Sequence, residues 1–224
     1  MSDEPSERTR LRRKADRGHY DRRTVYSIID DGLVCHLGVT LDGHPTIIPA
    51  TYGRLVDHLY VHGSQANRVL TALAQGVEAC VEITVLDGVV LGRSPMRHSM
   101  NYRSVVIYGS FREAVHEREK LRAIEAILEH VVPGRLAGLR TPTTSELERT
   151  RFLALPLRDY SAKIREGRPT QDANDDLGVW SGVIPLGTEM FTPVPADEAA
   201  AAVELPGAVE DWPIRCSAPG GRSV

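Results

Sequence analysis

The sequence predicts a mainly β fold, a β-barrel of antiparallel strands with a few helices. Two observations carry this prediction: apolar runs of strand length dominate the chain, and Asp-Gly pairs separate two pairs of those runs. Strands joined by such short turns pair antiparallel, and closure into a barrel removes the exposed edges of the sheet. No G-x-G-x-x-G motif follows a strand, so a Rossmann-type dinucleotide site is not predicted.

Apolar runs of strand length lie at 33–40, 45–52, 58–63, 77–86, 89–94, 103–115, 151–165 and 179–186. Asp42-Gly43 and Asp87-Gly88 each separate two of these runs, which predicts two hairpins because both turn residues must adopt positive φ. Gly109, inside the run 103–115, indicates a bulge or a barrel corner.

Three segments repeat apolar residues at helical spacing: 23–31, 64–75 and 117–130. Gly32 and Gly76 follow the first two directly, and Pro133-Gly134 lies just beyond the third, as is typical of helix ends. We expect Ser64 to be the N-cap of the second helix, because its hydroxyl can accept a hydrogen bond from an N–H group of the first turn.

The charge pattern restricts the class of partner. The 224 residues carry 27 Lys and Arg against 30 Asp and Glu, a formal net charge of −3, and only three of the cations are lysines. We therefore expect an arginine guanidinium to hold any bound anion. Residues 8–23 have a local charge of +6, which indicates either a solvated arm or a nucleic-acid or membrane patch. Because residues 24–224 carry a net charge of −6, nucleic-acid binding is not expected.

The remaining signals point to a cytoplasmic protein with one main domain. No apolar run approaches 18 residues and no secretory signal follows the basic N-terminus, so no membrane association is expected. The cysteines, Cys35, Cys80 and Cys216, are odd in number and form no C-x-x-C motif, which argues against an oxidising compartment. We divide the chain into a basic N-terminal arm (1–22), a barrel domain (23–192) and a Pro/Ala-rich acidic tail (193–224).

The first candidate site is the sequence His62-Gly63-Ser64 with Asn67 and Arg68. A strand followed by a capped helix start offers free N–H donors, and a guanidinium in the first turn adds a positive charge, so the pattern is typical of a phosphate site. An ordinary capped helix with a surface arginine explains the same residues equally well.

The second candidate site is the segment 93–109, rich in arginine, with His98 and Tyr102 just before an apolar strand. It reads either as a barrel rim that faces an anionic or aromatic ligand or as a polar connection. Trp180, which lies between two nearby glycines, could lie against a ligand or fill the end of the barrel. The eight histidines form no H-x-H or H-E-x-x-H pair, so no metal site is predicted.

Together these motifs resemble the pyridoxamine 5′-phosphate oxidase-like flavoproteins, and within them the flavin-nucleotide-binding branch related to nitroimidazole-resistance reductases. The resemblance covers roughly residues 10–190 and rests on the segments PTIIPATYG, LYVHGSQANR, RSPMRHSMNYRSVVIYGSFR, SAKIREG and VWSGVIPL. It implies a split β-barrel that binds FMN at a homodimer interface.

The resemblance also implies which residues contact the cofactor. In such folds one strand lies along the isoalloxazine ring, a strand-to-helix step holds the phosphate, a later strand adds polar contacts, and a late tryptophan reaches the cofactor, sometimes from the partner chain. These positions fall here on Ile48, Pro49, Ala50 and Thr51, on His62, Gly63, Ser64, Asn67 and Arg68, on Tyr102, Arg103 and Ser104, and on Trp180.

The resulting functional prediction is an FMN-dependent oxidoreductase acting on a small molecule. His62 or His98 could deliver a proton to substrate, since imidazole titrates near neutral pH, or both could only position the cofactor. The alternative is a non-catalytic protein that binds or senses a flavin, a deazaflavin or haem on the same barrel. Oxidation of pyridoxine phosphate is not expected, because Asn67-Arg68 replaces the Arg-Lys pair of the oxidase proper and supplies a single cation.

Overall fold

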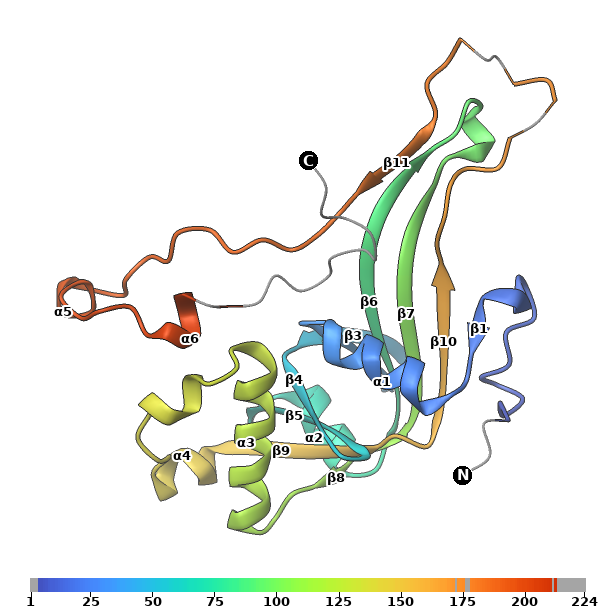
Figure 1. Ribbon diagram of the computed structural model, residues 1–224. Coiled ribbons are helices and arrows are strands. Elements are labelled where there is room, and N and C mark those ends of the chain that lie inside the picture. Colours follow the sequence, from blue (N-terminus) through green and yellow to red (C-terminus); the bar gives the residue numbers. More distant parts are fainter. Residues whose placement is uncertain (1–3, 172, 176–177, 211, 213–224) are drawn as a thin grey trace.

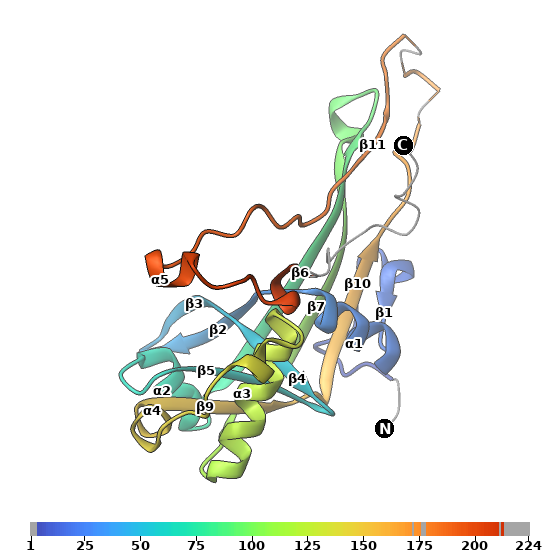
Figure 2. The same cartoon turned by 60° about the vertical axis from the view of Figure 1, so that its left-hand side comes forward.

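The computed structural model describes residues 4–171, 173–175, 178–210 and 212. Its strands form two antiparallel sheets (Figures 1 and 2). In the larger sheet the order is β1 (Gly18–His19), β10 (Asp159–Arg165), β7 (Ser99–Ser110), β6 (Glu78–Leu91), β2 (Cys35–Leu41) and β3 (His44–Ala50), and β11 (Gly182–Pro185) also pairs with β6. The smaller sheet has the order β4 (Tyr52–Leu55), β5 (His58–Ser64), β9 (Thr150–Pro156) and β8 (Arg112–Glu113). The prediction of a mainly β fold is confirmed.

The helices lie around these sheets. They are α1 (Arg22–Asp31), α2 (Arg68–Ala74), α3 (Glu117–Val131), α4 (Thr144–Arg149), α5 (Glu198–Ala201) and α6 (Gly207–Glu210), with 3-10 turns η1 (Ala15–Arg17), η2 (Pro95–Arg97) and η3 (Arg135–Gly138). The predicted helices 23–31 and 117–130 are confirmed as α1 and α3. Within the described ranges no helix is long and apolar enough to span a membrane.

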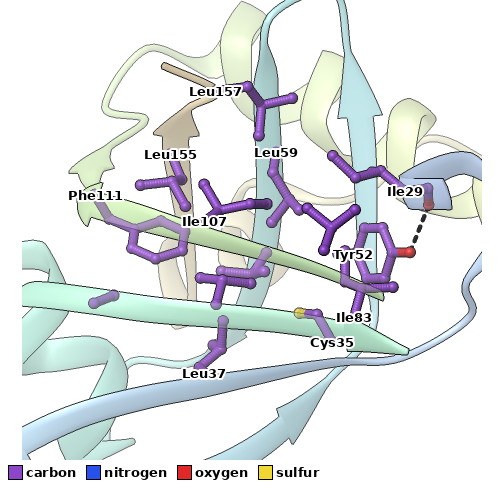
Figure 3. Packing of buried hydrophobic residues seen from close by; sticks show 14 of the residues in the cluster. Ile29, Cys35, Leu37, Tyr52, Leu59, Ile83, Ile107, Phe111, Leu155 and Leu157 are labelled. Atoms are coloured by element: carbon purple, nitrogen blue, oxygen red, sulfur yellow. Dashed lines mark hydrogen bonds between the residues drawn. The ribbon is translucent and has the colours of Figure 1, made fainter. Parts of the chain in front are cut away.

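The main core lies between the two sheets and α1 (Figure 3). Odd-numbered residues of β6 such as Val81 and Ile83 are fully buried, because side chains of a strand alternate between its two faces. Tyr52 is also fully buried, and its hydroxyl donates to the backbone oxygen of Ile29 at 2.6 Å. This bond ties α1 to the start of β4 and so fixes the junction between the two sheets.

The predicted hairpin at Asp87-Gly88 is wrong, whereas the one at Asp42-Gly43 is confirmed. Asp42 and Gly43 have φ of 51° and 79°, as the turn requires. Asp87 and Gly88 instead lie inside the continuous strand β6, where the register shifts by a bulge. Asp87 is held by two hydrogen bonds from Arg103 on β7, so the neighbouring strand keeps this pair in the ladder. The chain turns only beyond Leu91.

The prediction of a single strand over 151–165 is wrong, because these residues form two strands that belong to different sheets. β9 ends at Pro156, and the N–H of Leu157 donates to the oxygen of Asp57 at 2.9 Å while Arg158 closes a tight turn back to Pro156. The chain thereby passes from the smaller to the larger sheet. A similar change of sheet follows Gly109 near the end of β7, close to the corner that this glycine indicates.

The described parts of the two predicted ends contact the rest of the chain. In the N-terminal arm, β1 pairs with β10, and Arg8 makes ion pairs with Asp159 and Glu78. The tail extends away from the sheet after β11 and returns to α3 (Figure 1), where the indole N–H of Trp212 donates to the oxygen of Val131 at 2.7 Å. The last part of the predicted tail, with Cys216, lies outside the described residues.

Candidate functional site

The first part of the candidate site is the turn between β5 and α2. Ser64 is not the N-cap of the helix, as the sequence suggested, because its backbone is still paired with Thr150 in the β5–β9 ladder. The N–H of Asn67 donates to the Ser64 oxygen at 3.0 Å and closes a turn. Asn67 is the N-cap, since its side chain accepts from the N–H of Leu70 at 3.1 Å. The hydroxyl of Ser64 accepts from Ala66 at 3.2 Å and shapes the same turn.

Close packing between β5 and α2 explains why residue 63 is a glycine. A Cβ at this position would lie 2.6 Å from the Leu70 Cδ1 atom, far inside van der Waals contact. The glycine therefore lets α2 lie close against β5, which brings the start of the helix beside the end of the strand.

Arg68, in the first turn of α2, is the accessible cation of this region. Its side chain is 81% exposed and pairs at 3.1 Å with Asp42, which is itself 83% exposed. An ion pair between two such exposed groups contributes little, so the guanidinium can exchange this carboxylate for another anion. Because Asp42 lies in the β2–β3 turn, the contact also places that hairpin beside the start of α2.

The predicted ring-binding residues lie on and just after β3, an edge strand of the larger sheet. Pro49 and Thr51 are exposed, whereas Ile48 and Ala50 are half-buried and pack on the core. Tyr52 at the start of β4 pairs with Val61 of β5 in an antiparallel ladder. The next residues in that register, Thr51 and His62, therefore lie beside each other. The structure therefore gathers the residues of β3, β5 and α2 around one open edge.

The surroundings of His62 in this group favour the neutral imidazole. Its ring stacks on Phe152 with centroids 5.9 Å apart and planes inclined by 16°. Burial lowers the pKa of His62, because the face against Phe152 is shielded from water. The residue as a whole remains exposed, so the shielding is one-sided and the edge of the ring stays accessible.

The second predicted group lies on β7, where strand alternation separates its members. Tyr102 and Ser104 share the outward face of the sheet, and Arg103 lies on the other face. Arg103 donates from Nε and Nη2 to Asp87 at 3.0 and 2.9 Å and from Nη1 to Asp31. The hydrogen bonds to Asp87, with the one to Asp31, raise the pKa of Arg103 although burial opposes them. This fork holds the end of α1 to the sheet.

His98 and Trp180 lie farther out, where β6 and β7 project beyond the barrel (Figure 1). The Nδ1 atom of His98 is 3.0 Å from the oxygen of Ser94, and Trp180 is 65% exposed and packs beside Gly182. Strands β2 and β6 lie between β3 and β7, so β3 and β7 are about 14 Å apart across the sheet. Within one chain the predicted site residues therefore form two separate groups. One lies around Arg68 and the other around β7, and Trp180 does not reach Arg68.

Two cations that the sequence analysis does not single out lie beside the second group. In the β7–β10 register Lys163 is opposite Ser104 and Arg165 is opposite Tyr102, and the buried Arg165 guanidinium donates to Asn101. The sequence does contain a signal for them, because Lys163 and Arg165 occupy alternate positions of a predicted strand. Among the described residues, no three His, Cys, Asp or Glu side chains are placed to hold a metal ion.

Two solved structures resemble this chain over most of its length. The FAD and heme binding protein from Mycobacterium smegmatis is 36% identical, with a TM-score of 0.82 over 87% of this chain and 96% of that one. The flavocytochrome Anf3 from Azotobacter vinelandii is 31% identical, with a TM-score of 0.85 over 92% of this chain and 96% of that one. These similarities confirm the split-barrel fold.

A third solved structure supports the fold alone. It is a protein from Bacteroides thetaiotaomicron assigned to 5-nitroimidazole antibiotic resistance, 21% identical, with a TM-score of 0.55 over 64% of this chain and 84% of that one. No curated protein sequence matches the chain. The model of the family described as pyridoxamine 5′-phosphate oxidase matches residues 21–164, so this chain belongs to that family.

Proposed function

We propose that this protein is a flavoprotein that binds a flavin nucleotide and uses it as an oxidoreductase acting on a small molecule. The observation that carries the proposal is the similarity, above 30% identity and over most of both chains, to two proteins whose names include a flavin cofactor. A bound flavin would supply hydride or single-electron transfer, and the protein would supply its position and electrostatic environment.

The residues at the open edge fit the phosphate end of a flavin nucleotide. Arg68 can release Asp42 and donate a bidentate pair of hydrogen bonds to a phosphate. The first N–H groups of a helix lack acceptors within that helix, so the start of α2 adds donors beside the hydroxyl of Ser64. The edge of β3 from Ile48 to Thr51 offers backbone groups and apolar side chains to a flat ring.

The lowered pKa of His62 restricts the roles that this residue can have. With its pKa lowered, the imidazole at neutral pH can accept a proton or a hydrogen bond, and it adds no positive charge to the site. We propose that it positions the cofactor or takes a proton from substrate. His98 remains the second candidate for proton transfer, with Nε2 left available when Nδ1 donates to Ser94.

We further propose that the protein acts as a homodimer. Ile47 on β3 and Leu86 on β6 are 68% and 48% exposed although both belong to the larger sheet, and exposed apolar side chains on a sheet favour an interface. A second copy would also supply the second group of residues: Trp180 lies far from Arg68 within one chain, and the partner's copy could reach the cofactor there.

A second candidate function is electron transfer between a flavin and haem, which is favoured because both of these relatives are also haem proteins by name. Histidine is a common axial ligand of haem iron, and His62 and His98 are both exposed and so accessible to a ligand. The choice of flavin, FMN or FAD, and the presence of haem are separate questions that one preparation can answer.

The test is the absorbance spectrum of the purified protein, followed by chromatography of the released cofactor and an assay of reduced-nicotinamide oxidation. We expect flavin bands, with FMN or FAD in the extract, and a Soret band if haem is bound. Arg68→Ala should lower the flavin content, whereas Arg158→Ala, an exposed arginine at the β9–β10 turn, should not. Protein that stays colourless after incubation with FMN, FAD and haem would refute the proposal. Light scattering that shows only a flavin-loaded monomer would refute the dimer.

A further inference from the structure

Three cations lie on the two segments that join where β1 pairs with the edge of β10, away from Arg68. Gly18 of β1 pairs with Lys163, which places the preceding Arg17 beside this strand, and Arg165 lies two residues farther along it. Figures 1 and 2 show β1 running next to β10 on the side of the barrel away from α2 and α4. Two segments almost 150 residues apart therefore bring like charges together.

Arg165 is unusual because it is buried without a counter-charge. Its residue is only 8% exposed, and its Nη1 atom donates to the side-chain oxygen of Asn101 and to the oxygen of Gly167. Burial lowers the pKa of Arg165, and the positive charge of Arg17 lowers it further. Arg103, on the neighbouring strand, is also mostly buried, but its charge is balanced by two carboxylates, those of Asp31 and Asp87.

The surrounding cations are unpaired as well. In the part of the chain that the structure describes, neither Arg17 nor Lys163 forms an ion pair, and the neighbouring acids Asp16 and Glu166 do not pair with any of the three cations. Arginines elsewhere in the described chain, such as Arg54, Arg112 and Arg151, pair with a carboxylate, whereas these cations do not. Such a cluster gains stability when an anion binds.

The free edge of the Arg165 guanidinium reaches the surface. Its Nη1 atom donates to Asn101 and to Gly167, and Nε and Nη2 have no acceptor among the described residues. No buried side-chain nitrogen or oxygen atom described in the structure lacks a hydrogen-bond partner, so these two atoms must retain contact with solvent. Nε and Nη2 form the planar edge that binds two oxygens of a phosphate at once.

Two hydroxyl-bearing residues lie beside these cations. Tyr102 faces Arg165 across the β7–β10 ladder and Ser104 faces Lys163. The Ser104 hydroxyl donates to the backbone oxygen of Lys163 at 3.5 Å, and it would turn from this long contact to bind an anion. Hydroxyl donors beside guanidinium and ammonium groups are suited to the several oxygens of a tetrahedral anion.

We propose that Arg17, Lys163 and Arg165, with Tyr102 and Ser104, form a binding site for a phosphate-type oxyanion, separate from the phosphate position at Arg68. The anion is either a phosphate group of a flavin nucleotide or that of a separate phosphorylated ligand. The site follows from the chain's own charges and does not depend on the proposed redox activity.

The experiment measures the binding of inorganic pyrophosphate to the full-length protein by titration calorimetry in phosphate-free buffer at constant ionic strength. The protein is used as purified, then stripped of any bound cofactor, then reloaded with FAD. We expect binding to the stripped protein, weakened roughly 10- to 100-fold by Arg165→Met, as for the loss of charge-assisted hydrogen bonds. Arg17→Gln and Lys163→Gln, which keep Arg165 in place, should each weaken it several-fold. Arg158→Met serves as the matched control and should bind normally.

The outcomes separate the two sources of phosphate. If FAD loading abolishes pyrophosphate binding and Arg165→Met also lowers FAD affinity, the site holds a phosphate of the flavin nucleotide. If binding survives loading, the site takes the phosphate of a separate ligand. Absence of binding to the stripped wild-type protein, or equal binding by the stripped wild type and all three variants, overturns the proposal. The proposal is also overturned if the protein binds no pyrophosphate and Arg165→Met abolishes dimer formation. In that case Arg165 would bind a carboxylate of the second copy.

Discussion

Replacement of Arg103 by alanine tests whether this residue holds the barrel together or holds a cofactor. Arg103 is 18% exposed at its side chain, and Asp87, its bidentate partner, is 11% exposed. Removing the guanidinium leaves Asp87 nearly buried and unpaired, and loss of one partner of a buried ion pair typically costs roughly 3–5 kcal/mol. Asp31, the other partner, is 40% exposed and adds little. We therefore expect Arg103→Ala to lower the free energy of unfolding by about 3 kcal/mol.

The assay is urea unfolding of wild type, Arg103→Ala, Asp87→Ala and the double variant. If the ion pair is structural, the double variant should be more stable than the sum of the single losses predicts, by about 1–3 kcal/mol. A loss below about 1 kcal/mol for Arg103→Ala, or strictly additive losses, would refute the reasoning. Unchanged stability together with lost flavin would instead make Arg103 a cofactor ligand, as the family resemblance implies.

Three further predictions follow from single contacts. Tyr52→Phe removes a buried hydroxyl that donates to Ile29, so urea unfolding should show a loss of roughly 1–3 kcal/mol with unchanged flavin content; equal stability would show that the bond is replaced. Gly63→Ala forces a Cβ against Leu70 and should cost roughly 1–3 kcal/mol, whereas Gly207→Ala, with no atom near its Cβ position, should be nearly neutral; equal effects of the two changes would refute the packing argument. The pKa of His62 is lower in the folded than in the unfolded chain, so the unfolded state binds the proton more readily and stability should fall as the pH drops below about 6.5. Unfolding curves at pH 5 and 7.5 should show a smaller difference for His62→Gln, and an unchanged difference would contradict the shift.

Two Asp-Gly pairs show where prediction from the sequence succeeds and where it stops. At Asp42-Gly43 the turn needs only local backbone freedom, and both residues adopt positive φ. At Asp87-Gly88 the same dipeptide stays in a strand, because Arg103 on β7 binds the carboxylate and β11 pairs along Gly88. The second outcome depends on strands that lie far away in the sequence, so no local pattern could indicate it.

Ser64 and Asn67 make the same point for the candidate site. The sequence places an N-capping residue type at both positions, and the choice between them depends on how far β5 pairs with β9. That ladder joins residues more than 80 positions apart. The local pattern therefore predicts that a capped helix follows the strand, and the sheet decides where the helix begins.

The sequence by itself determined the fold class, the helices α1 and α3, the first hairpin and the residue types around the candidate site, because strand and helix periodicity and turn chemistry are local properties. Only the tertiary structure decided which cations are already neutralised. Arg103 meets its carboxylates 16 and 72 positions away, while Arg165 finds an amide and a backbone oxygen instead. Charges choose partners by distance in space, and a chain with 27 Lys and Arg does not reveal from its order alone which of them remain free to bind an anion.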